Sequence, residues 1–98
     1  MLTKEEIKEK IIPVLEQFDI ARASLFGSFA RGDQSENSDV DIIIEFRSPE
    51  NRSLLDLVAV EQEISELLQR KADVLTVESI HPLLRSAISA EQEILYER

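Results

Sequence analysis

The sequence has 98 residues, 43% hydrophobic and 32% charged, which is typical of a single small globular domain over 1–98. Its formal net charge of −9 argues against a nucleic-acid partner, because an acidic surface repels phosphates unless a basic patch overrides the repulsion. There is no cysteine for a disulfide or thiolate metal site, and no apolar run approaches the roughly twenty residues of a membrane span, so we expect a cytoplasmic protein without membrane contact.

The N-terminal segment predicts a helix over residues 4–18. Thr3 and Glu6 have the spacing of a capping box, and apolar residues follow at helical spacing at Ile7, Ile11, Val14, Leu15 and Phe18. Pro13 lies inside this segment. We expect it to kink or restart the helix, because proline lacks a backbone donor and its ring clashes with the preceding turn.

Two strands are predicted next, with a short helical turn and a polar loop between them. The first covers residues 22–26 and ends at Gly27-Ser28, and residues 28–31 form a short helical turn that Gly32 stops. A polar loop then leads to a second strand over 39–47. This strand is apolar on both faces from Ile42 to Ile44, as expected for a strand covered on each side.

The second half predicts a helix, a strand, a helix and a short last strand. The first of these helices begins after Ser53 and ends near Arg70, and its apolar stripe is expected to face the core: Leu54, Leu57, Val58, Ile64, Leu67 and Leu68. A strand over 72–77, a helix from Pro82 to about residue 89 and a strand over 93–96 follow. The alternation of helices and strands indicates the α/β (α+β) class.

Asp39 and Asp41 stand at the head of the most apolar run in the chain. Strand side chains alternate with period two, so both carboxylates should point to one side, with Cα atoms roughly 6–7 Å apart. Like charges at this distance raise one pKa unless a cation lies between them. Because Mg²⁺ prefers carboxylate and phosphate oxygens, we hypothesise that the pair holds a metal that binds a nucleotide. The alternative is a strand end with two solvated acids.

Chain topology predicts that a third acid joins this pair. The crossover from the strand at 39–47 to the strand at 72–77 should make the two parallel, so Asp73 would begin at the same sheet edge as Asp39 and Asp41. The short link between the first two strands favours an antiparallel pair, which brings Gly27-Ser28 to that edge. The constellation suits phosphoryl-type transfer. Asp73 would complete a second metal site or accept the proton of an attacking hydroxyl, and Ser28 with its turn would hold the β- and γ-phosphates.

The motif Gly27-Ser28, ten intervening residues and Asp39-x-Asp41 resembles the signature of the DNA polymerase β-like nucleotidyltransferase superfamily. The fuller strings over 27–32 and 38–41, with the C-terminal 94–97, resemble its smallest branch, the minimal nucleotidyltransferase (MNT) family. The resemblance implies the nucleotidyltransferase fold, a small mixed β-sheet flanked by about four helices. It also implies one or two Mg²⁺ ions on Asp39, Asp41 and Asp73, and it adds Arg31 to Gly27 and Ser28 as a candidate nucleotide-binding residue.

The same resemblance implies a function. Many MNT proteins are antitoxins encoded beside a helical HEPN-type toxin, and some transfer AMP from ATP to a tyrosine of that toxin. We therefore expect a Mg²⁺-dependent protein adenylyltransferase whose partner supplies the acceptor hydroxyl, since the chain has no substrate domain like that of the larger relatives. Two alternatives are a non-catalytic antitoxin that masks its toxin by binding, and a small-molecule nucleotidyltransferase completed by a second chain.

Overall fold

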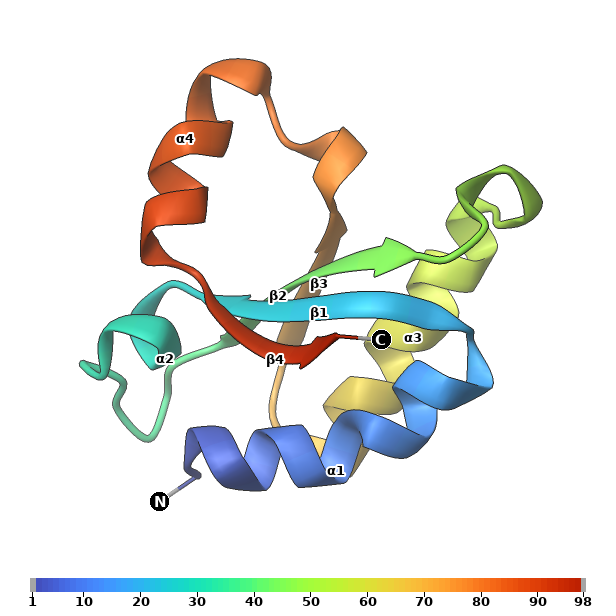
Figure 1. The fold of residues 1–98 in the computed structure, drawn as a ribbon. Helices are drawn as coiled ribbons and strands as arrows, with labels where there is room; N and C mark the ends of the chain where they lie inside the picture. Colours follow the sequence, from blue (N-terminus) through green and yellow to red (C-terminus); the bar gives the residue numbers. More distant parts are fainter. Residues whose placement is uncertain (1, 98) are drawn as a thin grey trace.

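The computed structural model describes residues 2–97, which form one four-stranded sheet with helices on both of its faces (Figure 1). In chain order the elements are α1 (Lys4–Gln17), β1 (Ile20–Phe26), α2 (Ser28–Arg31), β2 (Val40–Phe46), α3 (Leu54–Leu68), β3 (Ala72–Thr76), α4 (Pro82–Glu91) and β4 (Glu93–Glu97). Short 3₁₀ turns cover Pro49–Asn51 and Val77–Ser79. The predicted fold class is confirmed.

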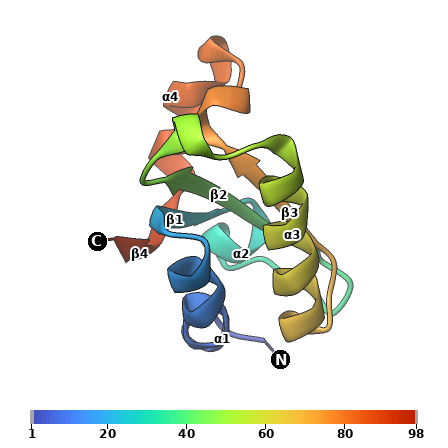
Figure 2. The ribbon, with the colours of Figure 1, turned by 90° about the vertical axis from the view of Figure 1, so that its right-hand side faces the viewer.

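The strand order is β3-β2-β1-β4, and the sheet is mixed. β1 runs antiparallel to both β2 and β4, whereas β2 and β3 are parallel, as the crossover through α3 predicts. α1 and α3 lie against one face of the sheet, and α4 stands over the other (Figures 1 and 2). α2 lies at the end of β1, beside the start of β2 (Figure 1).

The first helix is a single element. The Thr3 hydroxyl accepts a hydrogen bond from the backbone N–H of Glu6 at 3.2 Å, so the predicted cap is present. The expected restart at Pro13 does not occur, because α1 continues from Lys4 to Gln17. Buried residues flank Pro13 on both sides, Ile7 and Ile11 before it and Val14 and Leu15 after it. Packing of both halves outweighs the loss of one backbone donor.

The core lies between the sheet and the α1–α3 layer. Leu25, Ile42 and Ile44 of the central strands are fully buried against this layer. The predicted stripe of α3 is partly wrong: Val60, Ile64 and Leu68 are buried, but Leu54, Val58 and Leu67 are exposed. At 3.6 residues per turn, Val58 lies about 120° around the helix from Ile64, which places it off the buried side.

β3 is an edge strand whose outer backbone groups are covered by α3. The Ala72 N–H donates to the Ser65 hydroxyl at 3.1 Å, and the Val74 N–H donates to the Glu61 carboxylate at 3.0 Å. These bonds satisfy donors that an edge strand would otherwise leave open. Asp73 lies between them and is therefore held on a fixed backbone.

No helix within residues 2–97 has both the length and the apolar character needed to cross a bilayer.

Candidate active site

The turn after β1 places bare backbone against a carboxylate. Gly27 has φ 74° and ψ −149°, a conformation that only glycine adopts readily, and its carbonyl accepts bonds from the N–H groups of Ala30 and Arg31 at 3.1 Å. A Cβ at this position would lie 2.5 Å from Asp41 Oδ2. The glycine therefore serves two needs, the turn itself and the close approach of its backbone to Asp41.

Strand register gathers the predicted acids at one edge. Asp41 on β2 pairs with Phe26, the last residue of β1, and on its other side with Asp73 of β3. Asp39 lies just before β2, which begins at Val40 rather than at residue 39 as predicted. The Val40 N–H donates to the Lys71 carbonyl at 3.0 Å, so the contact between the β2 and β3 segments begins one residue after Asp39. The edge thus carries Asp39, Asp41, Asp73 and the Gly27 turn.

A lysine that the sequence reasoning missed lies among these acids. Lys71 Nζ is 3.9 Å from Asp39 Oδ2 and 4.0 Å from Asp73 Oδ1. The parallel register sets Val40 opposite Ala72, so the residues that precede them, Asp39 and Lys71, also lie side by side. Its signal in the sequence was the basic residue two positions before Asp73, but only the register shows that it also reaches Asp39.

Negative charge exceeds positive charge at this edge. The pKa of Asp41 is raised by burial first and then by the charges of Asp73 and Asp39, while Arg31 and Lys71 act in the opposite direction. No three Asp, Glu, His or Cys side chains in residues 2–97 stand together as a ready-made metal site. The three carboxylates nevertheless fit Mg²⁺, which prefers hard oxygen ligands and would balance their negative charge. The absence of a Cβ at Gly27 leaves space beside Asp41 Oδ2. Asp39, Asp41 and Asp73 are the residues that would hold it.

We expect Asp41 to titrate above its ordinary pKa of about 3.9. Asp73→Asn should lower that pKa, because the charge of Asp73 raises it more than the charge of Asp39 does. A raised pKa means that the folded chain binds the proton more tightly than the unfolded chain. This group's contribution to stability is therefore complete below about pH 4 and lost as the pH rises through the raised pKa.

Carboxyl-carbon NMR of the protein without added metal measures this titration directly. Asp39→Asn serves as the comparison and should lower the pKa of Asp41 less than Asp73→Asn does, in the order of the two charges. An Asp41 that titrates at or below its ordinary value would contradict this account of the site.

Ser28 and Arg31 occupy the two ends of α2. Ser28 follows Gly27 directly, so its side chain is carried by the turn that approaches Asp41. The Arg31 guanidinium pairs with Asp33 at 3.2 Å and with Glu91, at the end of α4, at 3.5 Å. Its charge still acts on Asp41. Arg31 therefore lies beside the acids, and a phosphate would have to compete with two carboxylates for it.

Comparison with known proteins identifies the family of this chain. Residues 7–95 match the family model described as a nucleotidyltransferase domain. A Methanocaldococcus jannaschii protein, MJ0435, assigned by inference as a protein adenylyltransferase, is 54% identical over 86 residues, covering 88% of this chain and 90% of that protein. Protein adenylyltransferase MntA of Thermococcus cleftensis is 34% identical over 84 residues, covering 82% of this chain and 83% of that protein.

Among solved structures, the chain resembles one described as a tri-AMPylated Shewanella oneidensis HEPN toxin in complex with MNT antitoxin. The TM-score is 0.74 at 17% sequence identity, and the match covers 98% of this chain and 74% of the matched chain. At that identity the likeness concerns the fold. This structure and the present chain therefore share a similar arrangement of helices and strands.

Proposed function

Because this chain belongs to the nucleotidyltransferase domain family, and to its minimal branch, we propose that it transfers AMP from ATP to a side-chain hydroxyl of a HEPN-type toxin and so neutralises it. We take the acceptor to be a tyrosine and the compartment to be the cytoplasm. The observation that carries the proposal is the meeting of Asp39, Asp41 and Asp73 with the Gly27 turn at one sheet edge.

The chain's own groups have separate roles in this reaction. The backbone at Gly27 and the Ser28 hydroxyl would hold the β- and γ-phosphates, so the α-phosphorus would lie toward Asp41. The acceptor oxygen bonds to the α-phosphorus as the bond to the bridging oxygen breaks, pyrophosphate leaves, and Asp73 takes the hydroxyl proton. Mg²⁺ on the carboxylates would neutralise the charge of the triphosphate and of the departing pyrophosphate.

The choice of a protein acceptor and a toxin partner has its support in the relatives. Both curated relatives are named as enzymes that adenylylate proteins, and the solved relative is a complex of an MNT antitoxin with an AMPylated HEPN toxin. The excess of acidic residues in this chain, −9 overall, suits a basic partner surface through complementary potentials.

The direct experiment incubates the protein with ATP labelled at the α-phosphate, Mg²⁺ and the product of the neighbouring open reading frame. We expect label on that partner, and mass spectrometry should place AMP on a hydroxyl side chain. ATP labelled at the γ-phosphate should leave the partner unlabelled, because pyrophosphate is the leaving group. An unlabelled partner in a stable complex with the folded protein would reject the transfer reaction.

A double variant that removes two of the proposed metal ligands separates neutralisation by masking from neutralisation by catalysis. Asp39→Ala combined with Asp41→Ala should still bind the partner but should no longer protect cells from it. If the double variant protects cells fully, binding suffices and the antitoxin works without transfer.

A further inference from the structure

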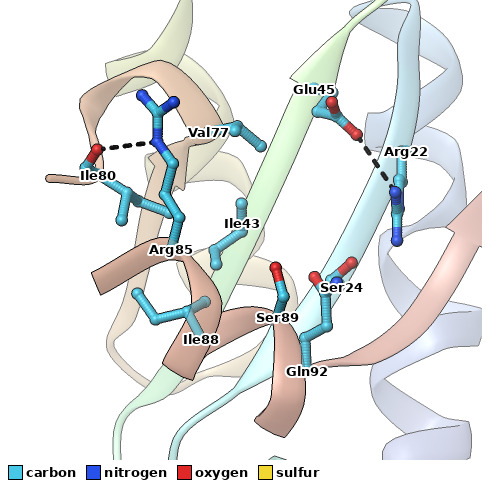
Figure 3. A pocket seen from close by; sticks show the side chains of 10 residues that line it. All are labelled: Arg22, Ser24, Ile43, Glu45, Val77, Ile80, Arg85, Ile88, Ser89 and Gln92. Atoms are coloured by element: carbon cyan, nitrogen blue, oxygen red, sulfur yellow. Dashed lines mark hydrogen bonds and ion pairs between the residues drawn. The ribbon is translucent and has the colours of Figure 1, made fainter. Parts of the chain in front are cut away.

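A cavity of about 170 Å³ lies between the sheet and α4 (Figure 3). α4 stands over the sheet face that α1 and α3 leave uncovered (Figure 1). The floor of the cavity includes Ser24 of β1 and Ile43 of β2, which are register partners. Each is two residues from a member of the Phe26–Asp41 pair, so the floor lies on the same face as Asp41, one strand repeat further along. The cavity therefore begins beside the candidate active site.

The roof of the cavity is formed by α4, whose C-terminal end contacts α2 beside the candidate active site. α4 supplies Ile88 and Ser89, and Gln92 follows at its end (Figure 3). The ion pair between Glu91 and Arg31, at 3.5 Å, joins this end of α4 to α2, which carries the Gly27-Ser28 turn. A half-exposed ion pair thus links the end of α4 to the short helix that carries the proposed triphosphate site.

The cavity lining includes a buried polar side chain, Ser24, and one buried polar atom without a hydrogen-bond partner, Arg22 Nε. Ser24 is 2% exposed and is the one polar residue counted as buried in the part of the chain described by the structure. Arg22 Nε is buried without a hydrogen-bond partner, and the nearest acid oxygen, on Glu97, is 3.7 Å away. Arg22 is also 3.8 Å from Glu45. Buried polar groups are nearly always bonded, so unused capacity at a cavity indicates a missing partner.

We propose that this cavity binds the purine base of the nucleotide substrate, an inference that rests on the proposed function. A cavity of about 150 Å³ accepts a benzene molecule, so 170 Å³ with an open side accommodates an aromatic base whose ribose points outward. Ile43 and Ile88 offer apolar contact to the ring faces. The Gln92 amide carries both donors and an acceptor, the pair of functions that recognises adenine. Ser24 and Ser89 add hydroxyls at the same end (Figure 3).

The geometry of transfer separates this cavity from the acceptor. The attacking and leaving oxygens lie roughly in line through the phosphorus. With pyrophosphate leaving toward the Gly27-Ser28 turn beyond β1, the acceptor approaches from the opposite side, over β3, where Asp73 takes its proton. The cavity over β1 and β2 remains for the nucleoside. The step of about 6–7 Å from Asp41 to Ile43 along β2 is spanned by the ribose.

Substitution Ser89→Trp tests the proposal by filling the cavity from an exposed position on α4, where unfolding is not expected. We expect the Kd for ATP with Mg²⁺ to rise about tenfold or more, the loss that follows when one aromatic ring is denied burial. The Kd for inorganic tripolyphosphate should stay within about twofold, because the phosphate site is untouched. Isothermal titration calorimetry measures both, with Leu83→Trp on the exposed surface of the same helix as the matched control.

A second variant tests base recognition without adding bulk. Gln92→Leu keeps the approximate size and removes the amide, so the preference for ATP over UTP should fall about tenfold or more. If both variants bind ATP as the wild type does, the base lies elsewhere, while the proposed transfer is unaffected. If the wild type binds neither ATP nor tripolyphosphate, the proposed function fails together with this site.

Discussion

Replacement of Asp41 by asparagine is expected to lower the rate of AMP transfer by about 10³-fold or more, because the proposed metal site would lose one of its carboxylate charges. The same change should stabilise the protein in the absence of metal. Asp41 is partly buried and faces the charges of Asp73 and Asp39, so its ionised form opposes folding at neutral pH. For a domain of this size, a gain of about 0.5 kcal/mol raises Tm by about 2–4 °C.

Thermal unfolding in a chelator, together with the transfer assay, measures both effects of Asp41→Asn. Asp19→Asn makes the same chemical change at an exposed carboxylate that pairs with Arg47, at the other end of β1. It should leave activity unchanged. A variant at Asp41 that retains more than about a tenth of the wild-type rate would remove this carboxylate from the reaction.

Replacement of Gly27 by alanine is expected to damage both the fold and the activity. The new methyl group would lie 2.5 Å from Asp41 Oδ2, a contact that requires the carboxylate or the turn to move. The backbone conformation at φ 74° and ψ −149° adds strain of about 1–3 kcal/mol for any residue with a Cβ. Since small displacements of reacting groups are costly, we expect a rate loss of about 100-fold or more in the molecules that remain folded.

Gly32 provides the matched control for the strain term. It also has a positive φ, 82°, but a Cβ there meets nothing within 4 Å. Gly32→Ala should therefore cost about 1–2 kcal/mol of stability through the left-handed conformation and leave the rate of transfer close to that of the wild type. Denaturant unfolding measures the loss of stability from backbone strain, and single-turnover kinetics measure the loss of transfer rate from displacement of Asp41. Equal rates for the two alanine variants would show that the approach of Gly27 to Asp41 has no part in the reaction.

The fold and the position of the candidate site could be predicted from the sequence because local signals and chain topology agree. The Thr3 cap, the Gly27 and Gly32 breaks and the apolar run after Asp41 each depend on neighbours in the chain. The right-handed crossover then fixes the parallel pairing that brings Asp73 beside Asp41. The short link between β1 and β2 favours the antiparallel pairing that brings the Gly27 turn to the same end of the sheet.

Features that depend on exact packing could not be predicted. The apolar pattern of α3 did not reveal that Leu54 and Val58 face away from the sheet, because several faces of that helix carry leucine or valine. Pro13 is tolerated since the residues on both sides are buried, a property of the tertiary structure. The contacts of Lys71 with Asp39 and of Glu91 with Arg31 join residues 32 and 60 positions apart, a separation that a linear pattern does not register.

The position of Lys71 gives the protein a resting form. Its ammonium group lies 3.9 Å from Asp39 and 4.0 Å from Asp73, so these two acids have a counter-ion in the absence of a divalent ion. The Lys71 side chain is 70% exposed and flexible, so its ammonium group can move away from the two carboxylates at little cost in free energy. A divalent ion bound by these two carboxylates would take the place of the Lys71 ammonium group, so one cation would replace another.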